Sequence, residues 1–196
     1  MHKLIFATNN PHKLREINEL LKGRFNIISL KQVGISEDIP ETEDTLEGNA
    51  LQKARFIYER TGTDCFADDT GLEVSALDGA PGVYSARYAG EEASFDDNMD
   101  KLLKALDGKE NRKARFRTVI ALIYNGDEYL FEGKVDGVIL SHKTGARGFG
   151  YDPVFLPDGF TKSFAEMEPE QKNTISHRGR SVQKLVQFLE GFANQD

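Results

Sequence analysis

Residues 46–75 read LEGNALQKARFIYERTGTDCFADDTGLEVS, a helical pattern that leads directly into short apolar runs. Over 46–60 the apolar residues recur at helical spacing, and Gly62 stands where a helix is expected to end. The next part predicts two short strands, 64–67 and 72–75, on either side of the polar run DDTG. A helix followed closely by strands is typical of the α/β class.

The same alternation continues on both sides of this stretch. Ser94 and Asp97 form a capping-box pattern at the start of a helix, and Asn125-Gly126 between two apolar runs predicts a hairpin. Hydrophobic periodicity predicts strands at 2–7, 25–30 and 154–156, and helices near 11–22, 94–106, 169–175 and 178–190. We therefore expect an α/β fold with a mixed central β-sheet flanked by helices.

Length and composition favour one domain. The chain has 196 residues, and no repeat, low-complexity segment or linker divides it, so 1–196 is treated as a single domain. The formal net charge is −7, which argues against broad nucleic-acid binding because that requires a basic surface. A few basic groups that converge on one site could still bind a small phosphorylated ligand.

The sequence also lacks the usual signs of a membrane or secreted protein. Its longest apolar run, VIALIY at 119–124, is far too short to span a bilayer, and MHKLIF resembles no signal peptide. Cys65 is the single cysteine, so no internal disulfide can form. We expect a cytoplasmic protein without a membrane or nucleic-acid partner.

A polar run, FATNNPHK at 6–13, stands between the first strand and the first helix. Asn10 as N-cap and Pro11 as first helical residue explain part of it as an ordinary helix start. Thr8 and Lys13 are not needed for that role. Together with the N–H groups of a helix N-terminus they could instead bind an anion, although the glycine pattern of a P-loop is absent. The residues alone leave both interpretations open.

A second candidate site is ADDTG at 67–71. Adjacent carboxylates repel each other unless a cation compensates, and a hard divalent ion such as Mg²⁺ would suit Asp68 and Asp69. The same residues are also typical of a turn stabilised by Asx hydrogen bonds, and neither interpretation is favoured. Further upstream, Glu41 precedes the helix that carries Asn49 and Lys53. Acidic residues there suit the helix dipole, and Asn49 is an unusual residue inside a helix.

Two later stretches could bind a polar aromatic ligand. TGARGFGYDPVF at 144–155 combines glycines with Phe149, which could stack on a base, and with Asp152, which could accept from a purine N–H. A tight turn around a core phenylalanine is the alternative, and we favour the ligand loop. QKNTISHRGRS at 171–181 places cations at a helix start, against the helix dipole, which suggests a bound anion or polar ligand. The combined chemistry favours a nucleoside triphosphate attacked by activated water.

These stretches together resemble the inosine triphosphate pyrophosphatase family, which acts on the non-standard purine nucleotides ITP, dITP and XTP. The resemblance covers nearly the whole chain and rests on six motifs in order: T-x-N-x-x-K at 8–13, Glu41 with T-x-x-x-N-A-x-x-K-A at 45–54, ADDTG at 67–71, GAPG-x-YSARY at 79–88, FGYDP at 149–153 and KN-x-x-SHR at 172–178. Gly48, where several members of that family carry a larger residue, is expected to affect only local helix stability.

The resemblance implies two lobes with a nucleotide cleft between them, a homodimer and Mg²⁺ as cofactor. It implies hydrolysis to the nucleoside monophosphate and pyrophosphate, by metal-assisted attack of water at the α-phosphorus. Asp69 would be the general base, with Lys13 as the main phosphate cation, and Glu41, Asp68 and Asp69 would bind or support the metal. Substrate contacts would come from Thr8, Asn9, Asn10, Lys13, Lys53, Thr70, Phe149, Gly150, Tyr151, Asp152, Lys172, His177 and Arg178.

The resemblance implies that Phe149 stacks on the base. It also implies that Asp152, His177 and Arg178 recognise the 6-oxo edge of the purine. Three alternatives remain: a related nucleotide pyrophosphatase for other modified bases, a non-catalytic nucleotide-binding protein, and an RNA-binding module. The net charge disfavours the last, and the adjacent acids at 68 and 69 disfavour a mere binding protein.

Overall fold

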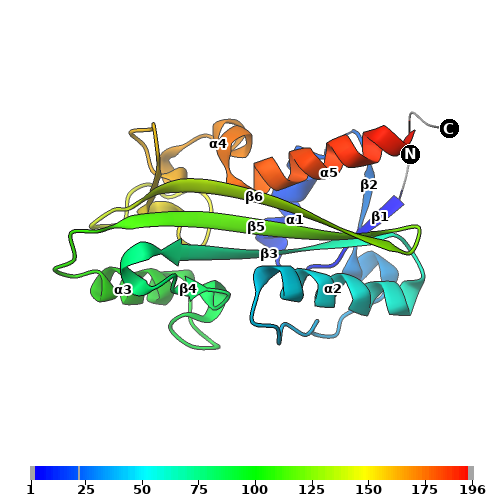
Figure 1. Ribbon diagram of the computed structural model, residues 1–196, viewed down its shortest axis with the longest axis horizontal. Helices are drawn as coiled ribbons and strands as arrows, with labels where there is room; N and C mark the ends of the chain where they lie inside the picture. Colours follow the sequence, from blue (N-terminus) through cyan, green and yellow to red (C-terminus); the bar gives the residue numbers. More distant parts are fainter. Residues whose placement is uncertain (1–2, 22, 194–196) are drawn as a thin grey trace. The chain divides into compact units, whose positions relative to one another are not determined.

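The structure is a computed structural model that describes residues 3–21 and 23–193. It has the predicted mixed α/β architecture. The described strands form one seven-stranded sheet in the order β2-β1-β3-β5-β6-β7, with β4 paired to β3 (Figure 1). The strands are β1 (Lys3–Phe6), β2 (Asn26–Ser29), β3 (Cys65–Val74), β4 (Pro81–Gly82), β5 (Lys113–Tyr124), β6 (Asp127–Ile139) and β7 (Phe155–Pro157).

The sheet is mixed because parallel and antiparallel pairs occur together. β1 pairs in parallel with both β2 and β3, whereas β4 on β3 and β7 on β6 are antiparallel. The α-helices are α1 (Pro11–Leu20), α2 (Leu46–Thr61), α3 (Phe95–Ala105), α4 (Pro169–Ile175) and α5 (His177–Ala193). Short 3₁₀ segments lie at η1 (Leu30–Val33), η2 (Ser75–Leu77), η3 (Ser85–Arg87), η4 (Asp152–Val154) and η5 (Phe164–Glu166).

The chain divides into two compact units. Unit 1 comprises 1–69, 118–133 and 178–196, and unit 2 comprises 70–117 and 134–177. The boundaries fall inside β3, β5 and β6 and after His177, the first residue of α5, so three strands contribute residues to both units. The expected division into two lobes is present at this level, and the nucleotide cleft between them stays a prediction.

In unit 1, helices cover both faces of the strands. α1 and α5 pack on one face, where Ile17 and Leu185 are fully buried against residues such as Phe6 and Phe66. α2 packs on the other face (Figure 1). There the Cys65 thiol donates to the carbonyl oxygen of Ala54. Since side chains alternate along a strand, the even-numbered positions in the unit 1 part of β3, residues 65–69, face α1 and α5, and the odd-numbered positions there face α2.

Unit 2 has its own hydrophobic core. Leu102 of α3 and Leu106, which follows that helix, pack with strand residues such as Leu72 and Phe116 and with Phe155 at the start of β7. Among the residues that the structure describes, no helix is both long and apolar enough to cross a bilayer.

Several local predictions are confirmed. Asn10 caps α1, with Pro11 as the first helical residue, and Gly62 ends α2 in the left-handed conformation at φ 58°. Ser94 and Asp97 form the capping box of α3. The β5–β6 hairpin turns at Asn125-Gly126, where φ is +51° and +86°, as a two-residue type I′ turn requires. Residues 2 and 22, at the ends of the predicted first strand and helix, lie outside the described residues.

One prediction is wrong: DDTG is not a turn between two strands. Residues 65–74 form a single ten-residue strand, β3, with both aspartates in its interior. Local preference favours a turn for this composition, but Asp68 and Asp69 are buried against basic side chains from distant parts of the chain. That pairing compensates the charges and allows carboxylates inside a buried strand.

Candidate active site

Asp68 faces α1 and α5 from the interior of β3 and is 1% exposed. Lys13 Nζ lies 3.1 Å from Asp68 Oδ1. Nε and Nη2 of Arg178 donate to Asp68 Oδ2 at 3.2 and 3.1 Å, and its Nη1 donates to Glu16. Burial opposes ionisation of Asp68, but the charges of Lys13 and Arg178 outweigh it and hold the pKa well below its usual value. Asp68 is therefore a fixed anion at the centre of a charge network.

Lys13 is partly desolvated by this arrangement. Burial lowers the pKa of its ammonium, Asp68 offsets part of the effect, and the nearby cations Lys53 and Arg178 add to the lowering. A polyanionic ligand next to Lys13 would favour the charged ammonium, because an additional negative charge stabilises it. The site is therefore suited to a phosphate group.

Asp69 faces the opposite side of β3, toward α2, and is 7% exposed. Asn49 Nδ2 donates to Asp69 Oδ2 at 3.2 Å, and Lys53 Nζ lies 3.8 Å from Oδ1. Burial raises the pKa of Asp69, and Lys53 and Lys13 only partly oppose this. The two adjacent aspartates thus have opposite pKa shifts, as expected for a fixed anion beside a proton acceptor.

Glu41 reaches the same group from the segment before α2. Its carboxylate pairs directly with Lys53 Nζ. Burial opposes its ionisation, but Lys53 outweighs this and lowers the pKa of Glu41. Burial also disfavours the charged form of Lys53, yet Asp69 and Glu41 raise its pKa, so the ammonium is held between two carboxylates. This part of the site already accommodates positive charge.

The described residues contain no cluster of three or more His, Cys, Asp or Glu side chains arranged to hold a metal ion. Glu41 and Asp69 share contact with one ammonium, and Asp68 is paired with Lys13 and Arg178. A divalent ion bound here would need ligands from substrate and water, as Mg²⁺ commonly does.

The 6–13 stretch builds its own helix start. Asn10 Oδ1 accepts from the backbone N–H groups of His12 and Lys13 at 2.9 and 3.2 Å. Thr8 Oγ1 accepts from Asn10 N at 3.1 Å, and Asn9 Nδ2 donates to the carbonyl oxygen of Glu37 at 3.3 Å. The capping interpretation is therefore confirmed. Because these helix N–H groups already have partners, an anion would be bound chiefly by side chains.

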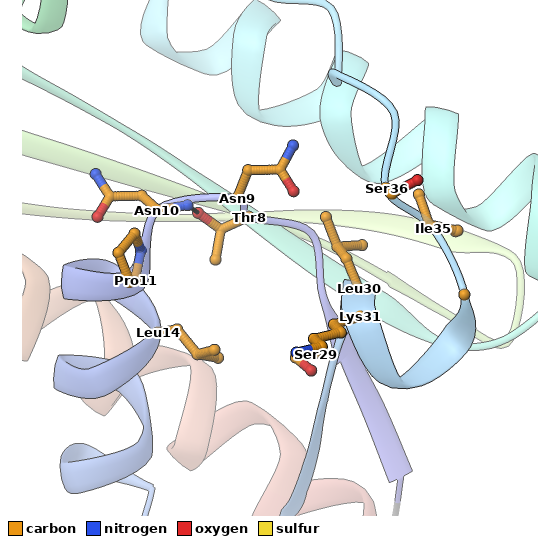
Figure 2. A pocket seen from close by; sticks show the side chains of 11 residues that line it. Thr8, Asn9, Asn10, Pro11, Leu14, Ser29, Leu30, Lys31, Ile35 and Ser36 are labelled. Atoms are coloured by element: carbon orange, nitrogen blue, oxygen red, sulfur yellow. Dashed lines mark hydrogen bonds between the residues drawn. The ribbon is translucent and has the colours of Figure 1, made fainter.

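A pocket of about 530 Å³ adjoins this stretch within unit 1. Figure 2 shows Thr8, Asn9 and Asn10 on one side and Leu30 of η1 with Ile35 on the other. The remaining lining residues are Pro11, Leu14, Ser29, Lys31, Gly34 and Ser36. The loop that begins α1 thus borders an open space that combines apolar walls with hydroxyl and amide groups.

In unit 2, Phe149 stands beside a buried ion pair. Lys172 Nζ donates to Asp152 Oδ2 at 2.7 Å, and the backbone N–H of Phe149 donates to the same oxygen at 2.9 Å. Lys172 Nζ also lies 5.4 Å from the centroid of the Phe149 ring. Gly148 has φ +74°, and a Cβ there would lie 2.0 Å from Asp152 Oδ2, so this close approach requires glycine.

His177 lies in the aromatic core of unit 2. Its ring stacks on Phe116 with centroids 4.5 Å apart and planes at 12°. Tyr151 is also buried, and its hydroxyl donates to the carbonyl oxygen of Ser85 at 2.8 Å. Burial raises the pKa of Tyr151. Tyr151 thus has a supporting position, whereas half-buried Phe149 keeps part of its ring accessible.

Comparison with known proteins identifies the family of this chain. The model of the Ham1 family matches residues 4–188. The chain belongs to the Ham1 family. A Porphyromonas gingivalis protein named dITP/XTP pyrophosphatase is 60% identical over 190 residues, which is 96% of this chain and 98% of the relative. A Flavobacterium johnsoniae protein of the same name is 56% identical over 187 residues, 95% and 97% of the two chains.

Solved structures of Ham1 proteins have the same fold. The Coxiella burnetii HAM1 protein matches with a TM-score of 0.90 and 38% identity, over 97% of this chain and 100% of that one. The Staphylococcus aureus Ham1 protein matches with a TM-score of 0.88 and 38% identity, over 96% and 98%. The predicted fold class is therefore confirmed.

The structure of this Ham1 family member separates the predicted site residues into two groups. Lys13, Glu41, Lys53, Asp68 and Asp69 form one network in unit 1, and Thr8, Asn9 and Asn10 lie in the same unit. Phe149, Gly150, Tyr151, Asp152, Lys172 and His177 belong to unit 2, as does Thr70, which follows Asp69 in β3. Arg178, which was expected to read the base, contacts Asp68 and Glu16 in unit 1.

Sequence reasoning missed three residues that contact these groups. Asn49 was noted as unusual inside a helix, and that signal could have led to its contact with Asp69. Glu16 stands three residues after Lys13, on the same side of α1, where an acidic partner for a cation could have been sought. Nothing in the sequence indicates the stacking of Phe116 on His177.

Proposed function

We propose that this protein hydrolyses dITP, XTP and ITP to the nucleoside monophosphate and pyrophosphate. The opposite environments of Asp68 and Asp69 carry the proposal, because they supply a fixed anion among cations and a separate proton acceptor on one strand. The names of relatives up to 60% identical support dITP and XTP as substrates. This activity would remove non-standard purine nucleotides from the nucleotide pool.

In this reaction, unit 1 acts on the triphosphate. Lys13 binds phosphate oxygens, and Thr8, Asn9, Asn10 and Lys53 add polar contacts. Asp69 accepts a proton from the attacking water, whose oxygen forms a bond to the α-phosphorus while the α–β bridging bond breaks. Pyrophosphate then leaves with the bonding electron pair. Such general-base assistance typically contributes about 10²- to 10⁴-fold in rate.

The same residues fit Mg²⁺ as a cofactor. Glu41 and Asp69 are hard oxygen ligands that both contact the Lys53 ammonium, so the site already stabilises a positive charge. Glu41 and Asp69 would hold the ion, and Asp68 would support them by keeping Lys13 and Arg178 in place. When bound, Mg²⁺ would neutralise phosphate charge and make the bound water more acidic.

Unit 2 acts on the base. Phe149 stacks on the purine ring, and Asp152, Lys172 and His177, with Thr70 and the backbone at Gly150 and Tyr151, complete the contacts. We assign Arg178 a contribution through its contact with Asp68, alongside the base-reading role that the family resemblance implies. A 6-amino purine would leave donors unpaired, which can reduce kcat/KM by about 10⁴-fold in a well-built site.

A cytoplasmic homodimer is part of the proposal. The reducing cytoplasm suits a chain with one buried free cysteine, Cys65. Tyr84 in the 79–88 stretch is 54% exposed and Leu130 in the β5–β6 hairpin is 46% exposed, so each is a candidate contact for a second copy. Light scattering coupled to size-exclusion chromatography tests the dimer, and a mass of one chain, 21.9 kDa, would contradict it.

The deciding experiment measures hydrolysis of dITP, XTP, ITP, dGTP and dATP with and without Mg²⁺. We expect pyrophosphate as product, dependence on the metal, and kcat/KM highest for the 6-oxo non-standard purines. Orthophosphate as product would refute attack at the α-phosphorus. Equal kcat/KM for dATP and dITP would refute the role of unit 2 in base selection, and activity only on other modified bases would favour the related pyrophosphatase.

A further inference from the structure

The segment that carries Glu41 is attached to α2 through two side chains of the helix. Gln52 Oε1 accepts from the backbone N–H of Thr42 at 2.9 Å, and Gln52 Nε2 donates to Thr42 Oγ1 at 2.7 Å. Asn49 Oδ1 accepts from the backbone N–H of Glu43 at 2.9 Å. The two residues that follow Glu41 are therefore each held by a different residue of α2.

Asn49 differs from Gln52 because it also reaches Asp69. Its Nδ2 donates to Asp69 Oδ2 at 3.2 Å, and its side chain is 1% exposed. The amide can have only one orientation here, since the Glu43 N–H must donate and an ionised Asp69 must accept. Reversing the amide would oppose donor to donor and acceptor to acceptor in the interior, which is costly.

The backbone at Gly48 permits this close approach. A Cβ at Gly48 would lie 2.7 Å from Glu43 Cβ, closer than side-chain atoms can pack. The segment around Glu43 therefore lies directly against the helix surface beside Asn49. This geometry gives Asn49 a fixed backbone partner on one side and a carboxylate on the other.

We propose that Asn49 is a positioning residue that sets the orientation of the Asp69 carboxylate and links it to the segment that carries Glu41. Asn49 holds Oδ2, and Oδ1 remains on the side of Lys53, 3.8 Å from its Nζ. The two carboxylate oxygens of Asp69 thus have different neighbours, the Asn49 amide and the Lys53 ammonium. The catalytic part of this inference rests on the proposed role of Asp69, whereas the orientation itself does not.

Three variants separate this role from simple support of the segment. Asn49→Asp keeps an oxygen for the Glu43 N–H but replaces the donor to Asp69 by a second carboxylate. Asn49→Ala removes both contacts. Gln52→Ala is the matched control, because it releases the same segment at Thr42 without touching Asp69. Assays with dITP at about pH 8.5 favour the ionised form of the added carboxylate, because a proton shared between the two acids could replace the lost donor.

We expect both Asn49 variants to lower kcat by about 10- to 100-fold with KM within about threefold, as is typical when a residue that orients a ligand or base is lost. Gln52→Ala should retain kcat within about threefold. Full kcat in Asn49→Asp, or an equal loss in Gln52→Ala, would overturn the proposal, because either result indicates support of the segment alone.

Crystal structures of the wild type and Asn49→Ala give a readout without activity. The Asp69 carboxylate should rotate away from its wild-type orientation in the variant, and an unchanged carboxylate would overturn the proposal. If the wild type releases no pyrophosphate from dITP or XTP, the proposed function fails, and the crystal structures still decide the orientation. If the wild type is active and the variants match it, only the assignment of Asn49 fails.

Discussion

The site residues of unit 1 are mostly charged, whereas those of unit 2 lie among aromatic rings. In unit 1, Lys13, Lys53 and Arg178 alternate with the carboxylates that they contact. In unit 2, one buried ion pair, Lys172 with Asp152, stands beside Phe149. A triphosphate needs cations and a proton acceptor, and a flat purine needs a stacking surface with few polar groups. The contrast therefore underlies the proposal that unit 1 binds the triphosphate and unit 2 binds the base.

Adjacent residues show the same contrast on a smaller scale. Asp68 and Asp69 have identical side chains, but burial raises the pKa of Asp69 whereas cations outweigh burial and lower that of Asp68. Their roles therefore follow from the face of β3 on which each lies.

The largest expected effect comes from exchanging the two aspartates for asparagine in separate variants. Asp69→Asn should lower kcat by about 10²- to 10⁴-fold while nucleotide binding persists, because the proton acceptor is lost. Asp68→Asn should chiefly destabilise the fold, by about 3–5 kcal/mol, because Lys13 and Arg178 lose their shared carboxylate. Steady-state kinetics and urea unfolding measure both. Retained turnover in Asp69→Asn would remove Asp69 from the general-base role.

Substituting one lysine in each unit tests whether unit 1 binds the phosphates and unit 2 binds the base. Lys13→Met should lower kcat/KM on the order of 10²-fold for every nucleotide equally, since all share the triphosphate. Lys172→Met should instead narrow the ratio of kcat/KM between dITP and dATP. Melting curves are needed first, because the second variant leaves Asp152 without its ion-pair partner. A change in base preference for Lys13→Met would contradict the division.

A smaller effect is expected for Gly48→Ala. Alanine favours a helix over glycine by about 1 kcal/mol, so local preference alone predicts a more stable protein. The added Cβ would, however, displace the segment at Glu43 and with it Glu41, lowering kcat on the order of tenfold. The close contact with Glu43 thus extends the expected effect at Gly48 beyond the helix itself. Unchanged kcat with raised stability would show that the segment adapts to the methyl group.

The smallest effect concerns Cys65, which is buried on β3 and donates its thiol to the carbonyl oxygen of Ala54. Burial raises its pKa from 9.0 to about 12, so the folded protein keeps the thiol protonated where the unfolded chain loses the proton. Stability should therefore fall as pH rises from about 9 to about 12. Cys65→Ala should lack this part of the slope in denaturant titrations. Rapid labelling of native Cys65 by a thiol reagent at about pH 8 would contradict its burial.

Local signals predicted most of the fold. Gly62, the Ser94–Asp97 capping box and Asn125-Gly126 act within a few residues of the structure that they terminate or turn, so each could be read from the sequence. That 65–74 form one continuous strand with both aspartates inside it could not be read from local sequence. The carboxylates of β3 depend on Lys13, 55 positions away, and Arg178, 110 positions away, and no local pattern reports such partners.

The candidate site was predictable to a similar degree. The motifs supplied the residue types and their membership in one family, and the structure assembles most of those in unit 1 into one network. The contacts of Asn49, Glu16 and Arg178 depend on which side of a helix meets which side of the sheet, a property of packing that the motifs do not encode.

The alternation along β3 has a consequence for protein engineering. Inserting one residue after Phe66 would leave every site residue present but exchange the faces on which the two aspartates lie. The Asp68 carboxylate would then lie beside Asn49, whereas Asp69 would lie on the other face at the present position of Thr70. Arg178 would meet Ala67 in place of a carboxylate. An alignment that tolerates a gap would still score this motif as intact. The proposed mechanism therefore depends on whether each aspartate stands at an even or an odd position of β3 as much as on its chemistry.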